Sequence, residues 1–400
     1  MFRPVLVLFL LSFVLAPCFG RGISVDADEA VLQEQALRER AAAIAASLDD
    51  RHLASQVIMT GIDGKRRLSA DMKLILGQCP PGAIMLFRYN LDTPKNEVKD
   101  FLDECREFVA AETGGLPPLI AVDHEGGSVH RFGPGVARLP AAAFWAEQAK
   151  TMGREGALAA LEEASFQSGT EIHGLGITMN LAPVAEVLNG DNRLFLEDRS
   201  FGAESQFTTD AAAAFIRGME RAGIGCTLKH FPGNTGTDPH EAAAVLRKSR
   251  EELAEMAAPF AALIKNQKVS AVMVSHALVP AWDSENIGSL SPAVIASWLR
   301  GTLGFTGIVL ADDFSMAAAI DTPRASSSRL SPEAAAVRSL AAGADMVMAW
   351  PLNIRQIHRA ILAALADGDL SRDRLREAAA RIIAEKIRLG LIPLSGKNRP

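Results

Sequence analysis

Short apolar runs alternate with longer amphipathic segments along most of the chain. Each run has four or five residues, and the runs cover 56–60, 83–87, 119–122, 177–181, 225–228, 271–275, 307–311 and 345–349. Continuous apolar runs separated by amphipathic segments are typical of parallel strands that helices cover on both faces. The pattern therefore predicts an α/β fold with eight parallel strands.

Ala-rich segments with helical periodicity lie between these runs. We expect a leading helix within 21–50 and further helices over 94–112, 151–173, 205–222, 250–266, 290–302, 331–342 and 354–366. Eight strand–helix units in about 300 residues fit a single (β/α)8 TIM-type barrel better than an open sheet. A doubly wound nucleotide-binding sheet would carry a Gly-rich phosphate loop, and neither GxGxxG nor GxxxxGK[ST] occurs. Residues 21–400 are therefore predicted to form one barrel domain.

The first twenty residues predict an export signal. A charged start at Arg3 precedes an apolar run over 5–16, and small or turn-type residues follow to Gly20. The run is too short for a membrane-spanning helix. We therefore expect an exported chain, periplasmic or extracellular, with no transmembrane span after processing. The segment before Cys18 resembles a lipobox, so a lipid anchor on Cys18 is the alternative to simple secretion.

Composition narrows the function classes. Hydrophobic residues make up 48% of the chain and charged residues 22%, which suits a large buried core. The net charge of -6, without a basic cluster, argues against nucleic acid as a partner. After Cys18 only Cys79, Cys105 and Cys226 remain, which is neither a CxxC metal site nor a disulfide scaffold. A Cys79–Cys105 disulfide after export stays open.

Polar residues follow several predicted strands directly. They are Asp123 and Glu125 after the third run, Asn180 in the fourth, Lys229 and His230 after the fifth, His276 after the sixth, and Asp312 and Asp313 after the seventh. The carboxyl ends of barrel strands meet at the mouth where barrel active sites form. The sequence therefore predicts a pocket for a ligand rich in hydroxyl groups. Either aspartate after the seventh run could instead cap the next helix, a reading that fits Asp313 better than Asp312.

Residues 225–240 carry the most informative motif. The pair Lys229–His230 ends an apolar strand, a Pro–Gly turn follows, and a short Gly/Thr loop then carries Asp238 and His240 two residues apart. An Asp-x-His pair on a strand-end loop can hold and tune an imidazole as a proton donor. The alternative is a solvated polar loop in which the aspartate caps a turn.

Together these motifs resemble family 3 glycoside hydrolases, in the β-N-acetylglucosaminidase branch. The similar segments run through nearly the whole mature chain. They are AVDHEGG at 121–127 with Arg131, NLAPV at 180–184, DRSFG at 198–202, KHFPG at 229–233, LGFTG at 303–307 leading to DDFSM at 312–316, and AGADM at 342–346.

The resemblance implies a retaining exo-hydrolase that removes terminal β-linked N-acetylglucosamine, with peptidoglycan fragments as the favoured carbohydrate substrate and neither metal nor other cofactor. Asp312 matches the nucleophile, and His240 matches the acid/base that Asp238 orients. The sugar-binding positions of the family match Asp123, Arg131, Arg199, Lys229 and His230.

The chain also departs from the family pattern. Asn234 stands where the family has a histidine after the Pro–Gly turn, and the approach to the Asp-x-His pair is two residues shorter. Pro239 replaces a small hydroxyl residue within that pair, Ser128 replaces an arginine and Glu186 replaces an aspartate. These changes affect the acid/base loop and its surroundings and leave the core catalytic positions in place.

Other functions are weighed against this one. A metal-dependent barrel hydrolase would be expected to carry HxH or HExxH, and a serine esterase GxSxG, none of which occurs. A non-catalytic glycan-binding barrel would keep the pocket, and the shortened loop is the feature that favours it. A family member acting on another β-glycoside is the remaining alternative, although family β-glucosidases generally carry a second domain and lack the Asp-x-His loop.

Overall fold

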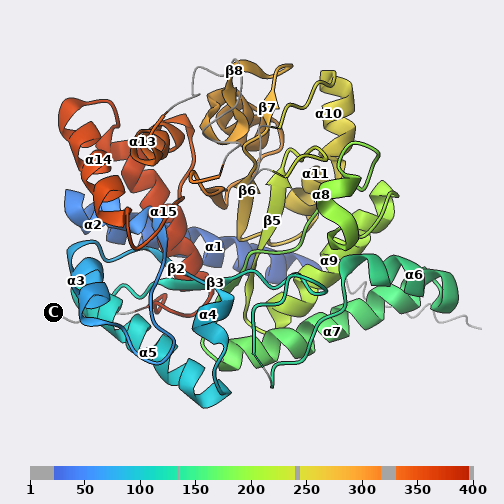
Figure 1. The fold of residues 1–400 in the computed structure, drawn as a ribbon, viewed down its shortest axis with the longest axis horizontal. Coiled ribbons are helices and arrows are strands. Elements are labelled where there is room, and N and C mark those ends of the chain that lie inside the picture. The colour runs from blue at the N-terminus through green and yellow to red at the C-terminus, as the bar shows by residue number, and fades with distance from the viewer. Residues whose placement is uncertain (1–21, 134, 239–243, 317–329, 396–400) are drawn as a thin grey trace, which may run out of the picture.

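Eight parallel strands surrounded by helices form the centre of the computed structural model, which describes residues 22–133, 135–238, 244–316 and 330–395 (Figure 1). The strand order is β10-β1-β2-β3-β4-β5-β6-β9, and a parallel bridge between Leu310 and Met346 links the two outer strands. The strands are β1 (Ile58–Gly61), β2 (Ala83–Leu86), β3 (Leu119–Val122), β4 (Met179–Asn180), β5 (Gly225–Phe231), β6 (Ala271–Val274), β9 (Ile308–Ala311) and β10 (Val347–Ala349). The predicted (β/α)8 TIM-type barrel is confirmed.

Each predicted apolar run overlaps one of these strands, because every strand residue is buried. Alternate side chains of one strand join two different apolar clusters. In β2, Ala83 and Met85 pack in one cluster, whereas Ile84 and Leu86 pack in the other. Burial on both faces removes the polar alternation that a half-exposed strand would show.

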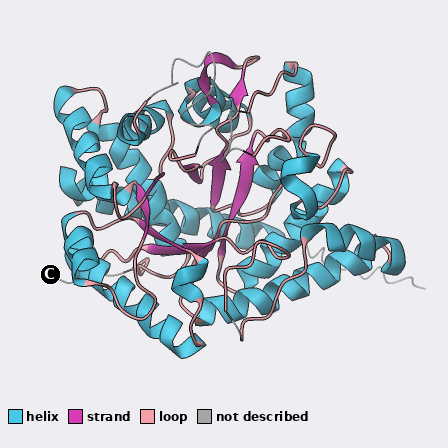
Figure 2. Cartoon of the chain, viewed as in Figure 1, coloured by secondary structure: helices cyan, strands magenta, loops and turns pink. Residues whose placement is uncertain are grey.

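Helices cover the outside of the strands (Figure 2). Those that match predicted segments are α1 (Gly22–Ser47), α5 (Lys95–Glu112), α7 (Arg154–Gly174), α9 (Ser205–Arg221), α13 (Pro332–Ala342) and α14 (Ile354–Asp367). The segment predicted as one helix over 250–266 is divided at Ala257 into α10 (Arg250–Met256) and α11 (Ala258–Asn266). The segment over 290–302 contains η3 (Ala293–Thr302), wound in the wider π form, and its last turn closes with Leu303 N donating to Trp298 O.

Further elements had no counterpart among the predicted segments. They are α2 (Asp50–Gln56), α3 (Ala70–Gln78), α4 (Arg88–Leu91), α6 (Ala142–Met152), α8 (Arg193–Leu196), η1 (Glu197–Arg199), η2 (Gly288–Leu290), α15 (Arg372–Arg388) and the antiparallel pair β7 (Leu278–Val279) and β8 (Asp283–Ile287). Helix α15 joins the N-terminal helix α1 to the barrel. Leu37 and Ile44 of α1 pack with Ile383 of α15, and Arg388 Nη2 lies 3.0 Å from Glu34 Oε1.

The cysteines of the described residues, Cys79, Cys105 and Cys226, are all buried and unbridged. The Cys79–Cys105 disulfide that the sequence left open is therefore absent. Cys79 follows α3 and packs in one apolar cluster, whereas Cys105 lies on α5 in the other. Burial raises the pKa of both thiols, that of Cys79 to about 11, so they behave as apolar core groups.

Within the described ranges, no helix combines the length and the apolar character needed to span a membrane. The predicted export signal and Cys18 lie outside the described residues.

A fully buried carboxylate holds together the end of the barrel at which β9 and β10 begin. Asp345, which precedes β10, accepts the N–H of Val309 at 2.9 Å. Its oxygens also contact the guanidinium groups of Arg374 and Arg381, each at 2.9 Å, and that of Arg300. This aspartate therefore connects two strands with η3 and α15.

We predict that Asp345→Asn destabilises the fold, because three guanidinium groups lose their common counter-charge. The free energy of unfolding should fall by about 3 kcal/mol in a urea titration followed by circular dichroism. The control is Asp367→Asn, which alters an exposed aspartate at the end of α14 and should change stability by less than about 0.5 kcal/mol. Similar losses in both variants would contradict a structural role for Asp345.

Candidate active site

Four of the predicted site residues lie at or near the carboxyl ends of the strands, which form one mouth of the barrel. Asp123 follows β3 directly, Lys229 and His230 lie near the end of β5, and Asp312 follows β9 directly. Parallel strands place all these positions at the same edge. The predicted clustering of polar groups at the mouth is thus a consequence of strand direction.

Lys229 is at the centre of a buried charge cluster. Its Nζ lies 2.7 Å from Asp123 Oδ1 and 2.7 Å from Glu125 Oε1, and the residue is 3% exposed. Burial by itself would lower the pKa of Lys229, but the two carboxylates raise it above its usual value. Lys229 is therefore held as a cation at the mouth.

Two arginines extend this cluster. Arg199 contacts both oxygens of Glu125, with Nε at 2.8 Å and Nη2 at 2.9 Å, and Arg131 Nη2 lies 3.4 Å from Asp123 Oδ2. Burial would raise the pKa of Glu125, but Lys229 and Arg199 hold it well below its usual range. Four of the five predicted sugar-binding residues thus form one network, in which Asp123 joins Arg131 to Lys229 and Glu125 joins Arg199 to Lys229. Glu125 was noted at the strand end but not assigned to the site. The HEGG segment after Asp123 was the available signal for it.

His230, the fifth predicted sugar-binding residue, is fixed by Glu186. The His230 Nδ1 atom lies 2.7 Å from Glu186 Oε1, and Glu186 is only 2% exposed. The centroid of the Phe195 ring lies 6.0 Å from that of the His230 ring, and the Arg199 guanidinium lies over the Phe195 ring, 5.2 Å from its centroid. Because Glu186 is an acceptor, the Nδ1 atom of His230 must carry a proton.

Asp312, at the end of β9, is half-buried and lies within the electrostatic influence of Lys229, His230 and His276. Its Oδ1 accepts the N–H of Asp313 at 2.9 Å. Burial would raise the pKa of Asp312, but the charges of His276 and His230, the Asp313 N–H and the charge of Lys229 together lower it. The carboxylate is therefore ionised at neutral pH, as a nucleophile requires.

The adjacent Asp313 has a different role. Its carboxylate accepts hydrogen bonds from Ser315 N at 2.8 Å, Ser315 Oγ at 2.7 Å and Trp350 Nε1 at 2.9 Å. These contacts stabilise the turn after β9 and join it to the residue that follows β10. Asp313 thus stabilises a turn, and the helix cap suggested for it stays a prediction, because residues 317–329 lie outside the described residues.

The loop after β5 is anchored near its start. Glu186 accepts the backbone N–H of Asn234 at 2.7 Å and its side-chain amide at 2.9 Å. At Gly236 a Cβ atom would lie 2.7 Å from Asp191 O, so the loop passes close to the neighbouring chain segment. Asp238 is half-buried, and His240 lies outside the described residues.

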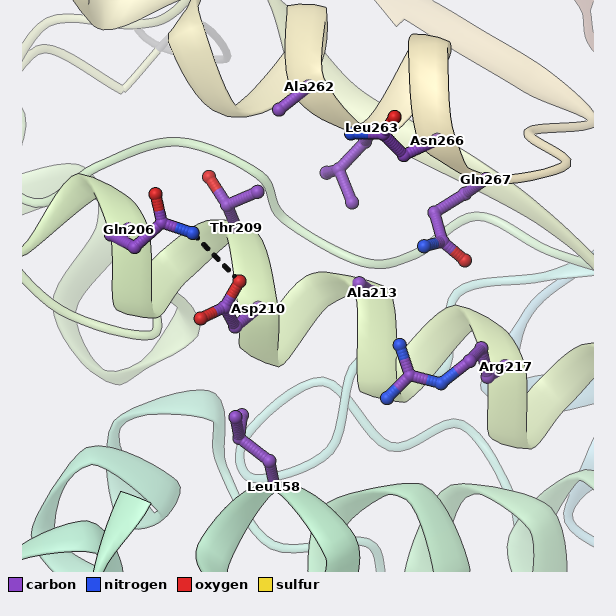
Figure 3. Close-up of a pocket in the computed structure, with 10 residues that line it drawn as sticks. All are labelled: Leu158, Gln206, Thr209, Asp210, Ala213, Arg217, Ala262, Leu263, Asn266 and Gln267. Carbon is purple, nitrogen blue, oxygen red and sulfur yellow. Dashed lines mark hydrogen bonds between the residues drawn. The ribbon is translucent and has the colours of Figure 1, made fainter. Parts of the chain in front are cut away.

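A separate pocket lies on the outside of the barrel between α7, α9 and α11 (Figure 3). It has a volume of about 410 Å³, and Gln206 Nε2 donates to Asp210 Oδ1 at its wall at 2.9 Å. Its lining does not include any of the predicted site residues. In the described parts of the chain, no group of three or more His, Cys, Asp or Glu side chains is arranged to hold a metal ion.

A (β/α)8 barrel with an ionised carboxylate beside buried hydrogen-bonding charges at its mouth is the architecture of a barrel-type glycoside hydrolase. The chain matches the glycosyl hydrolase family 3 N terminal domain over residues 47–384. It therefore belongs to glycoside hydrolase family 3.

Individual relatives agree with this assignment. The chain is 36% identical to a beta-hexosaminidase from Methylococcus capsulatus, over 78% of this chain and 88% of that protein. A family 3 beta-N-acetylglucosaminidase from Paenibacillus superimposes with a TM-score of 0.77 at 31% identity, and the match covers 86% of this chain and 63% of that one. NagZ from Neisseria gonorrhoeae, solved in complex with N-trifluoroacetyl-D-glucosamine, gives a TM-score of 0.67 at 26% identity over 84% and 97% of the two chains.

We predict that Lys229→Met destabilises the protein, because Asp123 and Glu125 lose the cation that they share. The free energy of unfolding should fall by about 3 kcal/mol in denaturant titrations. The matched control is Lys248→Met, which breaks an ion pair of the same 2.7 Å length to Asp191 at the surface and should cost less than about 1 kcal/mol. Equal losses in the two variants would argue against a buried charge cluster.

Proposed function

We propose that this protein is a retaining exo-β-N-acetylglucosaminidase that removes terminal β-linked N-acetylglucosamine. The observation that carries the proposal is the lowered pKa of Asp312 at the end of β9, beside the Lys229 cluster. The beta-hexosaminidase and beta-N-acetylglucosaminidase relatives, and the aminosugar analogue bound to NagZ, support an N-acetylated aminosugar as the ligand.

The proposed reaction has two balanced steps. In the first, an Asp312 oxygen attacks the anomeric carbon while the glycosidic C–O bond breaks, and the leaving oxygen takes a proton from the His240 imidazolium. In the second, His240 takes a proton from water, whose oxygen attacks the anomeric carbon and releases the Asp312 carboxylate. Asp238 orients and polarises the imidazole.

The charge cluster supplies the terminal-sugar site in this proposal. Asp123, Arg131, Arg199, Lys229 and His230 would bind hydroxyl groups of the terminal sugar. Their mutual ion pairs hold them in place before the substrate arrives, which lowers the entropic cost of aligning the anomeric carbon with Asp312.

The setting of the reaction is also a proposal. An export signal over residues 1–20 would place the enzyme in the periplasm or outside the cell, with a lipid on Cys18 as the anchored alternative. There, peptidoglycan-derived fragments are the favoured substrates and chitin oligosaccharides the second choice.

We predict that substitution of Asp312 lowers kcat far more than substitution of the adjacent Asp313. With chromogenic β-N-acetylglucosaminide, β-glucoside and β-xyloside, wild type should turn over the first alone. Asp312→Asn should lower kcat by about 10⁴-fold or more, because the nucleophile is lost. Asp313→Asn, which alters a carboxylate engaged with Ser315 and Trp350, should stay within about tenfold of wild type.

His240→Ala should reduce kcat/KM by about 10²- to 10⁴-fold when the leaving group is poor, because the general acid is missing.

Aminosugar binding without turnover in wild type would instead identify a non-catalytic glycan-binding barrel. Equal rates for wild type and Asp312→Asn would refute the nucleophile assignment.

A pH profile tests the electrostatics around Asp312. Its pKa is depressed in the fold, so the ionised form is retained until the pH falls below the usual 3.8, and the acid limb of kcat/KM should lie below that value. His276 makes the largest charge contribution to this depression, so His276→Asn should move the acid limb to higher pH. The alkaline limb, which reports His240, is the internal control and should not move. An unchanged acid limb would contradict this role for His276.

A further inference from the structure

Two positions at which the chain departs from the family pattern, Glu186 and Asn234, are in direct contact. Asn234 donates its backbone N–H to Glu186 Oε2 at 2.7 Å and its side-chain amide to Glu186 Oε1 at 2.9 Å. Both residues are almost completely buried, Asn234 at 1% and Glu186 at 2% exposure. Glu186 and Asn234 therefore form one structural unit at the start of the loop that leads to Asp238.

The same carboxylate also holds the sugar-binding histidine. Glu186 Oε1 lies 2.7 Å from His230 Nδ1 and accepts the His230 backbone N–H at 3.2 Å. A buried carboxylate needs such donors to offset the loss of water, and here the described donors all belong to His230 and Asn234. One side chain thus connects the end of β5 with the start of the acid/base loop.

The backbone that carries Glu186 is itself well fixed. Ala185 N donates to Lys229 O at 3.0 Å, and Ser200 Oγ donates to Glu186 O at 2.7 Å. The carboxylate is therefore a stationary point relative to β5. A fixed acceptor can determine both the protonated nitrogen of His230 and the direction in which the loop leaves the Pro232–Gly233 turn.

We propose that Glu186 and Asn234 act together as positioning residues for the reaction. Glu186 keeps the proton of His230 on Nδ1, so that Nε2 is presented to the sugar, and Asn234 fixes the origin of the loop that carries Asp238 and His240. Neither residue touches the substrate. This inference rests on the proposed glycosidase activity. It makes the Glu186 carboxylate the common anchor of the sugar-binding His230 and of the loop that carries the acid/base.

The two members of the pair should have separable kinetic effects. Asn234→Ala removes the side-chain hydrogen bond that ties the start of the loop to Glu186 but leaves His230 on Glu186, so it should impair proton donation with little change in KM. Glu186→Gln replaces one oxygen by an NH2 group, which meets an Asn234 donor in either orientation of the amide, and it removes the negative charge that holds the Nδ1 proton of His230. It should therefore raise KM as well as lower kcat.

The experiment compares β-N-acetylglucosaminides that have a 2,4-dinitrophenyl or a methyl leaving group. The dinitrophenolate leaves without a proton, whereas methanol needs one. For Asn234→Ala, kcat/KM should fall about tenfold with the methyl glycoside and less than about threefold with the dinitrophenyl glycoside. For Glu186→Gln, we expect a fall of about 10²-fold with the methyl glycoside and a raised KM for both substrates.

Asn266→Ala is the control, because it removes an exposed asparagine at the end of α11, on the outside of the barrel, and touches none of the contacts of Glu186. It should retain the leaving-group dependence of wild type. Retained dinitrophenyl activity and an unchanged melting temperature show that each variant is folded. Asn234→Ser provides a second, milder variant if Asn234→Ala does not fold.

Two failures can be distinguished. If wild type cleaves neither glycoside, the proposed function fails. If wild type cleaves both, and the Asn234 variants lose equal activity with each leaving group or none, the positioning role is overturned while the glycosidase stands.

Discussion

Lys229 can be buried at the mouth of the barrel because two carboxylates from the loop after β3 contact it. A lone ammonium group would lose its charge or destabilise the fold at such a depth. Asp123 and Glu125 supply the compensation, and Arg199 and Arg131 in turn compensate the carboxylates. Ion pairs thereby join the loop after β3, the turn η1 and the end of β5.

Lys229 also contributes, together with two histidines, to the ionisation of Asp312 at the end of β9. Burial favours the protonated form of Asp312, and the charges of His276, His230 and Lys229 reverse that preference. Two of these groups are also assigned to the sugar. Substrate recognition and the reactivity of the carboxylate therefore depend on one set of side chains, and a change in either property would be expected to alter the other.

The barrel could be predicted from the sequence because its strands are buried on both faces and stand out as unbroken apolar runs. Strand direction then placed Asp312 and Lys229 at a common edge. The division of the segment over 250–266 and the π form of η3 were not predicted, because both keep an ordinary helical spacing of apolar residues. The contacts of Glu186 could not be predicted either, since its partners come from another strand end. The positions of the export signal and of His240 stay predictions.

The two ends of the barrel are stabilised by different residues. Asp345 and its arginines join strand beginnings to outer helices, whereas the Lys229 cluster joins loops at the opposite end. Loops at the mouth can therefore change during evolution while the contacts of Asp345 at the opposite end are kept. The loop after β5, which is shorter than in the family pattern, is a change of this kind. Changes in such loops can alter glycan specificity while the barrel stays the same.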